Sequence, residues 1–158
     1  MTRKLTPQQL QHALREHRFP THDGWTMTTP TVTALVATKG NECFNIEMLH
    51  DANPASHDDQ LCTALGRLLL TMRDHSPTMR WGIAAPHSDQ WLETLEKIPL
   101  RVLATVRLTL MLVGENSVTD YPNTYEYVER ALLDDEDLSD LVLGEGADDD
   151  LDAFLNGL

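Results

Sequence analysis

Residues 43–49 read Cys-Phe-Asn-Ile-Glu-Met-Leu, and this stretch decides the fold. Polar and apolar side chains alternate along it, which is typical of a strand with one buried face. A β-branched apolar stretch, Val32–Thr38, precedes it across the tight turn Lys39-Gly40-Asn41. The two stretches predict an antiparallel hairpin. Glu47 is the carboxylate near the end of the returning strand.

The segments on either side of the hairpin alternate between helical and strand patterns. Thr6 and Pro7 predict a helix start, and Ser56 and Ser88 are expected to cap two further helices. The resulting order is α-β-β-β-α-β-α-β, which indicates an α/β fold with a mixed central sheet flanked by helices. The expected elements beyond the hairpin are a helix from Pro7 to before Pro20, a strand at Trp25–Thr29, a helix at His57–Asp74, a strand at Thr78–Ala85, a helix after Ser88, a strand at Leu108–Val113 and a helix at Pro122–Leu133.

The composition indicates one domain, at residues 1–133, and an acidic tail at residues 134–158. No run of about 18 apolar residues occurs, so no membrane span is predicted. The N-terminus lacks an apolar signal core, which favours a cytoplasmic protein. The sequence places Cys43 and Cys62 as buried thiols.

The negative charge is concentrated in the tail. The chain has a formal net charge of −13, and residues 134–158 carry ten acidic residues without a lysine or arginine. Residues 1–133 hold 15 acids and 12 bases. Because nucleic-acid binding depends on cations that neutralise phosphates, we expect contacts with nucleic acid to be weak or indirect.

The predicted order of elements resembles the PD-(D/E)xK, or restriction-endonuclease-like, superfamily over roughly residues 7–120. In that superfamily an acid on the second core strand and Glu-x-Lys on the third converge on a phosphate. The carboxylates hold Mg²⁺, and the lysine stabilises developing negative charge. The resemblance rests on Ala34-Leu35-Val36-Ala37, Lys39-Gly40, Ile46-Glu47, Ala64-Leu65-Gly66-Arg67-Leu68-Leu69, Trp81-Gly82-Ile83-Ala84-Ala85-Pro86 and Leu108–Val113.

Transferred residue by residue, this resemblance implies a depleted site. Glu47 matches the glutamate of Glu-x-Lys, but Ala34 and Leu49 stand where the aspartate and the lysine are expected. Glu47 is therefore interpreted as a catalytic and metal-binding remnant, and no cofactor is expected. Under an alternative interpretation, Mg²⁺ is held because site residues have moved to neighbouring elements. The candidates are Glu16, Asp51, Asp58 and Asp59 as acids, with Lys39, Arg67 and Arg73 as cations.

The tail mixes acids with large apolar residues, whereas a purely solvating tail has few. Its last residues place apolar side chains at i, i+3, i+4 and i+7, the spacing of an amphipathic helix. We expect this segment to bind a groove on a protein partner. The alternatives are docking on the chain's own core and disorder. The expected partner-binding residues are Leu138, Leu141, Leu151, Phe154, Leu155 and Leu158.

Three functions follow from these patterns. The first is a catalytically impaired nuclease-fold protein that acts as an accessory or regulatory protein-binding subunit, in a bacterial DNA-processing or phage-defence system. The second is a Mg²⁺-dependent nuclease with relocated residues. The third is an acidic decoy that imitates nucleic acid. Elsewhere, Trp25, Trp81 and Trp91 are expected to pack in the core or at its rim.

Overall fold

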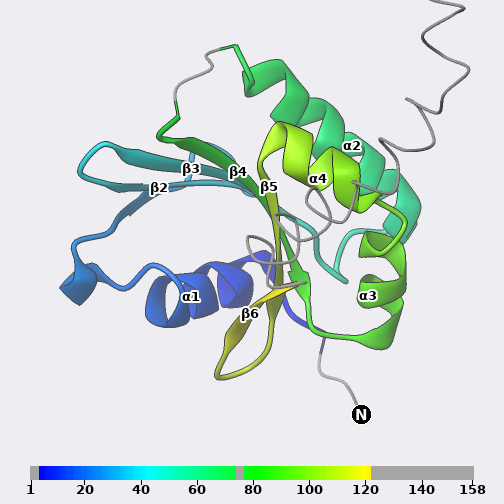
Figure 1. The fold of residues 1–158 in the computed structure, drawn as a ribbon. Helices are drawn as coiled ribbons and strands as arrows, with labels where there is room; N and C mark the ends of the chain where they lie inside the picture. The colour runs from blue at the N-terminus through cyan, green and yellow to red at the C-terminus, as the bar shows by residue number, and fades with distance from the viewer. Residues whose placement is uncertain (1–3, 74–76, 122–158) are drawn as a thin grey trace, which may run out of the picture.

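The sheet has six strands, and their spatial order is the same as their order along the chain (Figure 1). The computed structural model describes residues 4–73 and 77–121. The two central pairs, β3 with β4 and β4 with β5, are parallel, and the outer pairs are antiparallel. The strands are β1 (Thr26–Thr28), β2 (Ala34–Lys39), β3 (Glu42–Met48), β4 (Met79–Pro86), β5 (Leu108–Val113) and β6 (Val118–Tyr121).

Three of the helices begin where local sequence chemistry predicts. The Thr6 hydroxyl accepts the backbone N–H of Gln9, and Ser56 and Ser88 cap their helices in the same way. Each cap satisfies an N–H group that has no partner inside its helix. The helices are α1 (Pro7–His17), α2 (His57–Thr71), α3 (Asp89–Leu95) and α4 (Leu100–Val106), with a short 3₁₀ turn, η1, at Thr21–Asp23.

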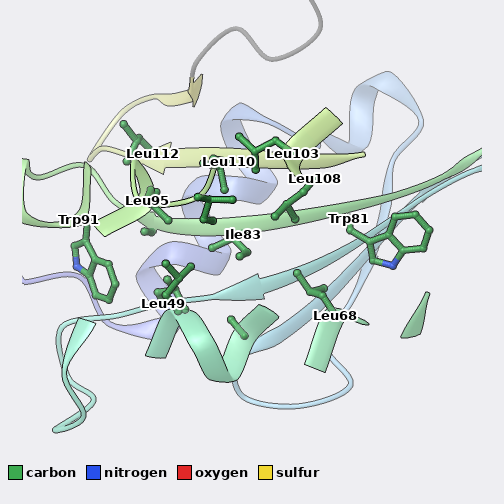
Figure 2. Close-up of a cluster of buried hydrophobic side chains, with 14 residues drawn as sticks. Leu49, Leu68, Trp81, Ile83, Trp91, Leu95, Leu103, Leu108, Leu110 and Leu112 are labelled. Atoms are coloured by element: carbon green, nitrogen blue, oxygen red, sulfur yellow. The ribbon is translucent and has the colours of Figure 1, made fainter. Parts of the chain in front are cut away.

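Helix α1 covers one face of the sheet, and α2, α3 and α4 cover the other (Figure 1). Each face has its own apolar cluster because successive strand side chains point to opposite sides. The α1 cluster includes Leu10, Leu14 and Ile46. The cluster beneath α2, α3 and α4 is larger and includes Ile83 and Trp91 (Figure 2).

The predicted mixed sheet with flanking helices is confirmed, and β2 and β3 form the predicted antiparallel hairpin. Ala34 pairs directly with Glu47 across β2 and β3. Helix α4 and strand β6 were not predicted. Helix α4 begins directly after Pro99. Strand β6 returns after the turn at Gly114. The helix expected at residues 122–133 and the tail at 134–158 lie outside the described residues.

Burial corrects the interpretation of both cysteines as buried thiols. Cys62 is exposed on α2, because the buried stripe of that helix is centred on Leu61, Ala64 and Leu68 and is narrower than its run of apolar residues. Cys43 is only partly buried, and that burial raises the pKa of its thiol. Within the described residues, no helix combines the length and apolar character needed to cross a bilayer.

The three tryptophans pack as expected. Trp81 and Trp91 are buried in the cluster beneath α2, α3 and α4. Trp25 is partly buried at the rim of the α1 cluster, edge-on to Phe19 with ring centroids 5.0 Å apart. These contacts assign the three indole rings to packing, which leaves Glu47 as the sequence-predicted residue around which a site can be built.

Candidate functional site

Glu47 lies near the end of β3, on the face of the sheet that α2 covers. Its neighbours Ile46 and Met48 point to the opposite face and belong to the α1 cluster. The alternation of strand side chains therefore directs Glu47 towards α2. Its side chain is 9% exposed, which is unusual for a carboxylate. A carboxylate this deeply buried requires polar partners.

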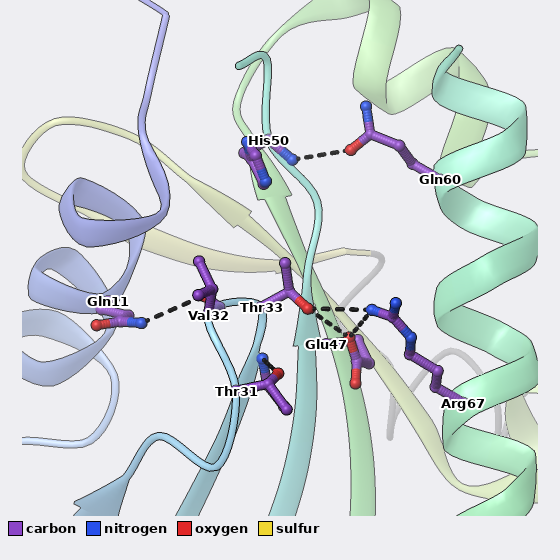
Figure 3. Close-up of polar contacts among 9 residues, drawn as sticks. Gln11, Thr31, Val32, Thr33, Glu47, His50, Gln60 and Arg67 are labelled. Atoms are coloured by element: carbon purple, nitrogen blue, oxygen red, sulfur yellow. Dashed lines mark hydrogen bonds and ion pairs between the residues drawn. The ribbon is translucent and has the colours of Figure 1, made fainter. Parts of the chain in front are cut away.

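Two side chains supply those partners, and both converge on one oxygen (Figure 3). The Thr33 hydroxyl donates to Glu47 Oε2 at 3.3 Å. Arg67 Nη1 lies 3.6 Å from the same oxygen and donates to Thr33 Oγ1 at 3.1 Å. Thr33 precedes β2 and Arg67 lies on α2. The Thr33–Glu47–Arg67 triad therefore joins three separate segments.

Burial and the triad act in opposite directions on the charge of Glu47. Desolvation is the largest influence and raises the pKa of the Glu47 carboxyl above its usual value. The Arg67 charge and the hydrogen bonds from Thr33 and Arg67 lower that pKa, but by less. Arg67 itself is 56% exposed, so solvent screens part of its charge. The site therefore holds a carboxylate that is only partly compensated.

Two positions beside Glu47 carry apolar side chains. Ala34 lies across the hairpin from Glu47 and presents a methyl group. Leu49 is 2% exposed and belongs to the cluster beneath α2, α3 and α4. Neither side chain can ligate a metal or donate a hydrogen bond.

Three of the seven relocation candidates, Asp51, Asp58 and Lys39, have contacts away from Glu47. The Trp91 indole donates to Asp51 at 2.9 Å, and Lys97 pairs with Asp58 at 2.7 Å. The Lys39 ammonium lies 5.8 Å from the Trp25 ring centroid. Glu16 is an exposed residue of α1, on the far side of the sheet from the triad. Asp59 lies in the first turn of α2, and Arg73 follows that helix. Among the candidates in the described segments, Arg67 alone has a recorded contact with Glu47.

A cavity of about 520 Å³ opens beside the triad. Thr33, Glu47 and Arg67 line it together with the amides of Asn53 and Gln60. Gln60 also accepts the His50 backbone N–H at 3.2 Å (Figure 3). Sequence reasoning did not identify Thr33 or Gln60, since each is an ordinary polar residue until the fold brings it to β3.

The cavity residues do not fit Mg²⁺. This ion takes six oxygen ligands in near-ideal octahedral geometry and is usually anchored by carboxylates. Glu47 is the single carboxylate among the described lining residues, and a guanidinium stands beside it. Over residues 4–73 and 77–121, no group of three His, Cys, Asp or Glu side chains is placed to hold a metal ion. The cavity instead offers one carboxylate, one guanidinium and neutral hydrogen-bonding groups.

Comparison with known proteins finds similarity in three dimensions but none in sequence. No protein-family model matches the chain, and no curated protein matches it. One similar crystal structure is that of an XisH family protein from Nostoc punctiforme. Its sequence is 18% identical to this one, the TM-score is 0.49, and the match covers 72% of this chain and 94% of that chain. Another is the crystal structure of a fdxN element excision controlling factor protein from Anabaena variabilis. Its sequence is 15% identical, the TM-score is 0.47, and the match covers 71% of this chain and 93% of that chain. At these values the similarity assigns no function, and membership of the PD-(D/E)xK superfamily stays a prediction.

Proposed function

We propose that this protein is a catalytically inactive member of a nuclease fold that acts by binding another protein through its acidic C-terminal segment. The observation that carries the proposal is the composition of the site around Glu47. The carboxylate faces Arg67 and Thr33, and Ala34 and Leu49 beside it are apolar. The superfamily resemblance assigns these two positions to the second acid and the lysine. A role in bacterial DNA processing or phage defence is part of the proposal and rests on the superfamily resemblance alone.

The chemistry of phosphodiester hydrolysis argues against activity at such a site. The reaction needs an activated water and positive groups aimed at the charge that develops on phosphorus-bound oxygens. Arg67 is the cation nearest to Glu47 in the described chain, and its charge is shared with that carboxylate. One carboxylate alone is a poor site for Mg²⁺, which is usually held by more oxygen ligands than Glu47 supplies.

The catalytic part of the proposal is tested by metal binding and cleavage together. Mg²⁺ and Mn²⁺ binding is measured by calorimetry, and cleavage is measured on single- and double-stranded DNA and RNA. Wild type, Glu47→Gln and the control Glu42→Gln are compared, since Glu42 is an exposed carboxylate at the other end of β3. We expect no micromolar metal binding and no cleavage that depends on Glu47. Metal binding and cleavage that Glu47→Gln abolishes and Glu42→Gln preserves would establish the relocated-ligand nuclease instead.

The binding part is tested on the tail. Proteins retained by the wild-type chain are compared with those retained by Phe154→Ser/Leu155→Ser, with Asn156→Ser as a neighbouring control. We expect the double variant to lose partners that the control keeps. Equal retention by all three chains contradicts binding through the apolar stripe. Retention that DNA competes away and that the double variant does not affect indicates the acidic decoy.

A further inference from the structure

The outer surface of α2 and α4 exposes large apolar side chains. Leu69 and Leu70 on α2 are 58% and 73% exposed, and Val102 on α4 is 42% exposed. Val32, at the cavity beside Glu47, is the other large hydrophobic residue that is exposed in the described segments. Single exposed apolar residues are common, but apolar residues that gather on one side of a protein mark an interaction surface.

Exposed arginines lie on or at the ends of the same two helices, although the protein as a whole is strongly acidic. They are Arg73, Arg101 and Arg107, whereas Arg67 faces Glu47. An acidic segment that approaches the protein is attracted to this region more than to the mixed charges elsewhere.

The C-terminal ends of the two helices both lie beside Trp81. The indole of Trp81 donates to Thr71 Oγ1 of α2 at 3.1 Å. The backbone N–H of Trp81 donates to the carbonyl of Arg107, the residue that ends α4, at 3.5 Å. Leu68 of α2 and Leu103 of α4 also belong to one buried cluster (Figure 2). We call Leu69, Leu70, Arg73, Arg101, Val102 and Arg107 the α2–α4 surface.

The described chain ends on this side of the sheet. Tyr121, the last residue of β6, donates its hydroxyl hydrogen to Glu96 at 2.8 Å. Its side chain lines a cavity together with Leu100 and Leu103 of α4. Residues 122–133 alone can extend across about 40 Å, whereas a 15-residue helix such as α2 is only about 22 Å long. Residues 134–158 can therefore reach any part of the α2–α4 surface.

We infer that the α2–α4 surface is the docking site for this chain's own C-terminal segment, residues 134–158. The segment matches the surface in both respects, because it carries ten acids without a base and an apolar stripe that includes Phe154 and Leu155. Its apolar side chains cover Leu69, Leu70 and Val102, and its acids lie beside the arginines. This docking rests on the proposed function in one respect, namely that the tail is a binding segment. A partner of the tail then has to displace it from α2 and α4.

Hydrogen–deuterium exchange of the full chain tests this directly. We expect amides within residues 134–158 to exchange about tenfold or more slowly than an unstructured segment of the same sequence. Leu69→Ser/Leu70→Ser is expected to remove that protection. Val32→Ser is the matched control, since it removes an equally exposed apolar side chain away from the surface, and it is expected to keep the protection. Wild-type exchange at the unstructured rate overturns the inference, and so does protection that survives the double substitution.

Two further measurements identify the occupant and the contribution of charge. Protection that is unchanged on tenfold dilution, with a monomer mass by light scattering, supports docking within one chain. Protection that disappears on dilution together with a dimer shows that a second copy is the occupant, and overturns the inference. Arg73→Glu and added salt are each expected to speed tail exchange, and no change in either case contradicts the role of charge. None of these readouts involves metal or nuclease substrate, so their failure is distinguishable from an active Glu47 site.

Discussion

The two sides of β3 pack in opposite ways. On the α1 side, Phe44, Ile46 and Met48 are almost completely buried in an apolar cluster. On the α2 side, the same strand presents Asn45 and Glu47, and a cavity opens between the strand and the helix. One strand therefore provides a packed core on one side and a polar site on the other.

This difference shows where the protein can tolerate change. The α1 side is filled by apolar side chains, so its stability depends on shape and volume. On the α2 side of β3, the protein holds a partly compensated charge and open space. The contribution of this region to the stability of the protein therefore depends on ionisation and solvent. Four predictions test that contrast, beginning with the largest expected effect.

Ile46→Ala tests the packed side. Ile46 is 2% exposed, so truncation removes buried contacts and leaves a cavity. We expect the free energy of unfolding to fall by about 2–5 kcal/mol, measured by urea denaturation. Asn45→Ala, at the adjacent position on the polar side, is the control and is expected to cost less than about 1 kcal/mol. Similar losses at the two positions would contradict the contrast between the two sides.

Gly82→Ala tests whether the packed side has room for one more methyl group. A Cβ at Gly82 would lie 2.5 Å from Met111 Cε and 3.3 Å from Ile46 Cγ1. We expect a loss of about 1–3 kcal/mol, reduced where the flexible end of Met111 can move. Gly66→Ala on α2 is the matched control, since nothing lies within 4 Å of its added Cβ. Alanine is expected to stabilise that helix by about 0.5–1 kcal/mol. Thermal or urea unfolding of the two variants should therefore shift in opposite directions.

Glu47→Gln tests the charge on the polar side through its dependence on pH. Burial raises the pKa of Glu47 above the ordinary value of 4.5, so the carboxyl ionises more readily in the unfolded chain. Its favourable contribution to stability is complete below about pH 4.5 and is lost as pH rises through the folded-state pKa. We expect unfolding measurements to show Glu47→Gln gaining stability relative to wild type between pH 4 and pH 7. Glu42→Gln should lack this trend. If the stability gained by Glu47→Gln over wild type shrinks as pH rises, the folded-state pKa of Glu47 is lowered rather than raised.

Arg67→Gln is expected to have the smallest effect. Arg67 is more than half exposed, and such ion pairs stabilise proteins weakly. Its charge nevertheless lowers the pKa of Glu47, so its removal should raise that pKa further. The measurement is an NMR titration of the Glu47 side-chain carboxyl carbon in the two proteins. Arg73→Gln is the control, since Arg73 lies beyond the end of α2. A Glu47 titration that is the same in all three proteins would show that Arg67 does not affect the site.

The features that the sequence predicted correctly depend on local chemistry. The antiparallel hairpin followed from the turn at Lys39-Gly40-Asn41 and the alternation on either side of it. The capping roles of Thr6, Ser56 and Ser88 followed from side chains that reach their own helix. Strand β5 was predicted with its observed bounds, because five apolar residues among six consecutive positions are typical of a central parallel strand.

The features that it missed depend on contacts between distant segments. Arg67 was one of several candidate cations, and its contact with Glu47 depends on how α2 lies over β3. The exposure of Cys62 and Leu69 depends on which part of α2 faces the sheet, and helical spacing alone made the buried stripe too wide. Strand β6 is short, and its pairing with β5 is determined by the sheet edge that it meets.

The strand order has a consequence for synthesis. Because the strands are adjacent in space in the order in which they occur along the chain, each new strand pairs with the one made just before it. A chain that emerges from the ribosome can therefore extend its sheet in one direction, and no central gap has to stay open for a strand made later. The exposed sheet edge moves along with synthesis to β6, which is an edge strand of the described sheet and has only four residues.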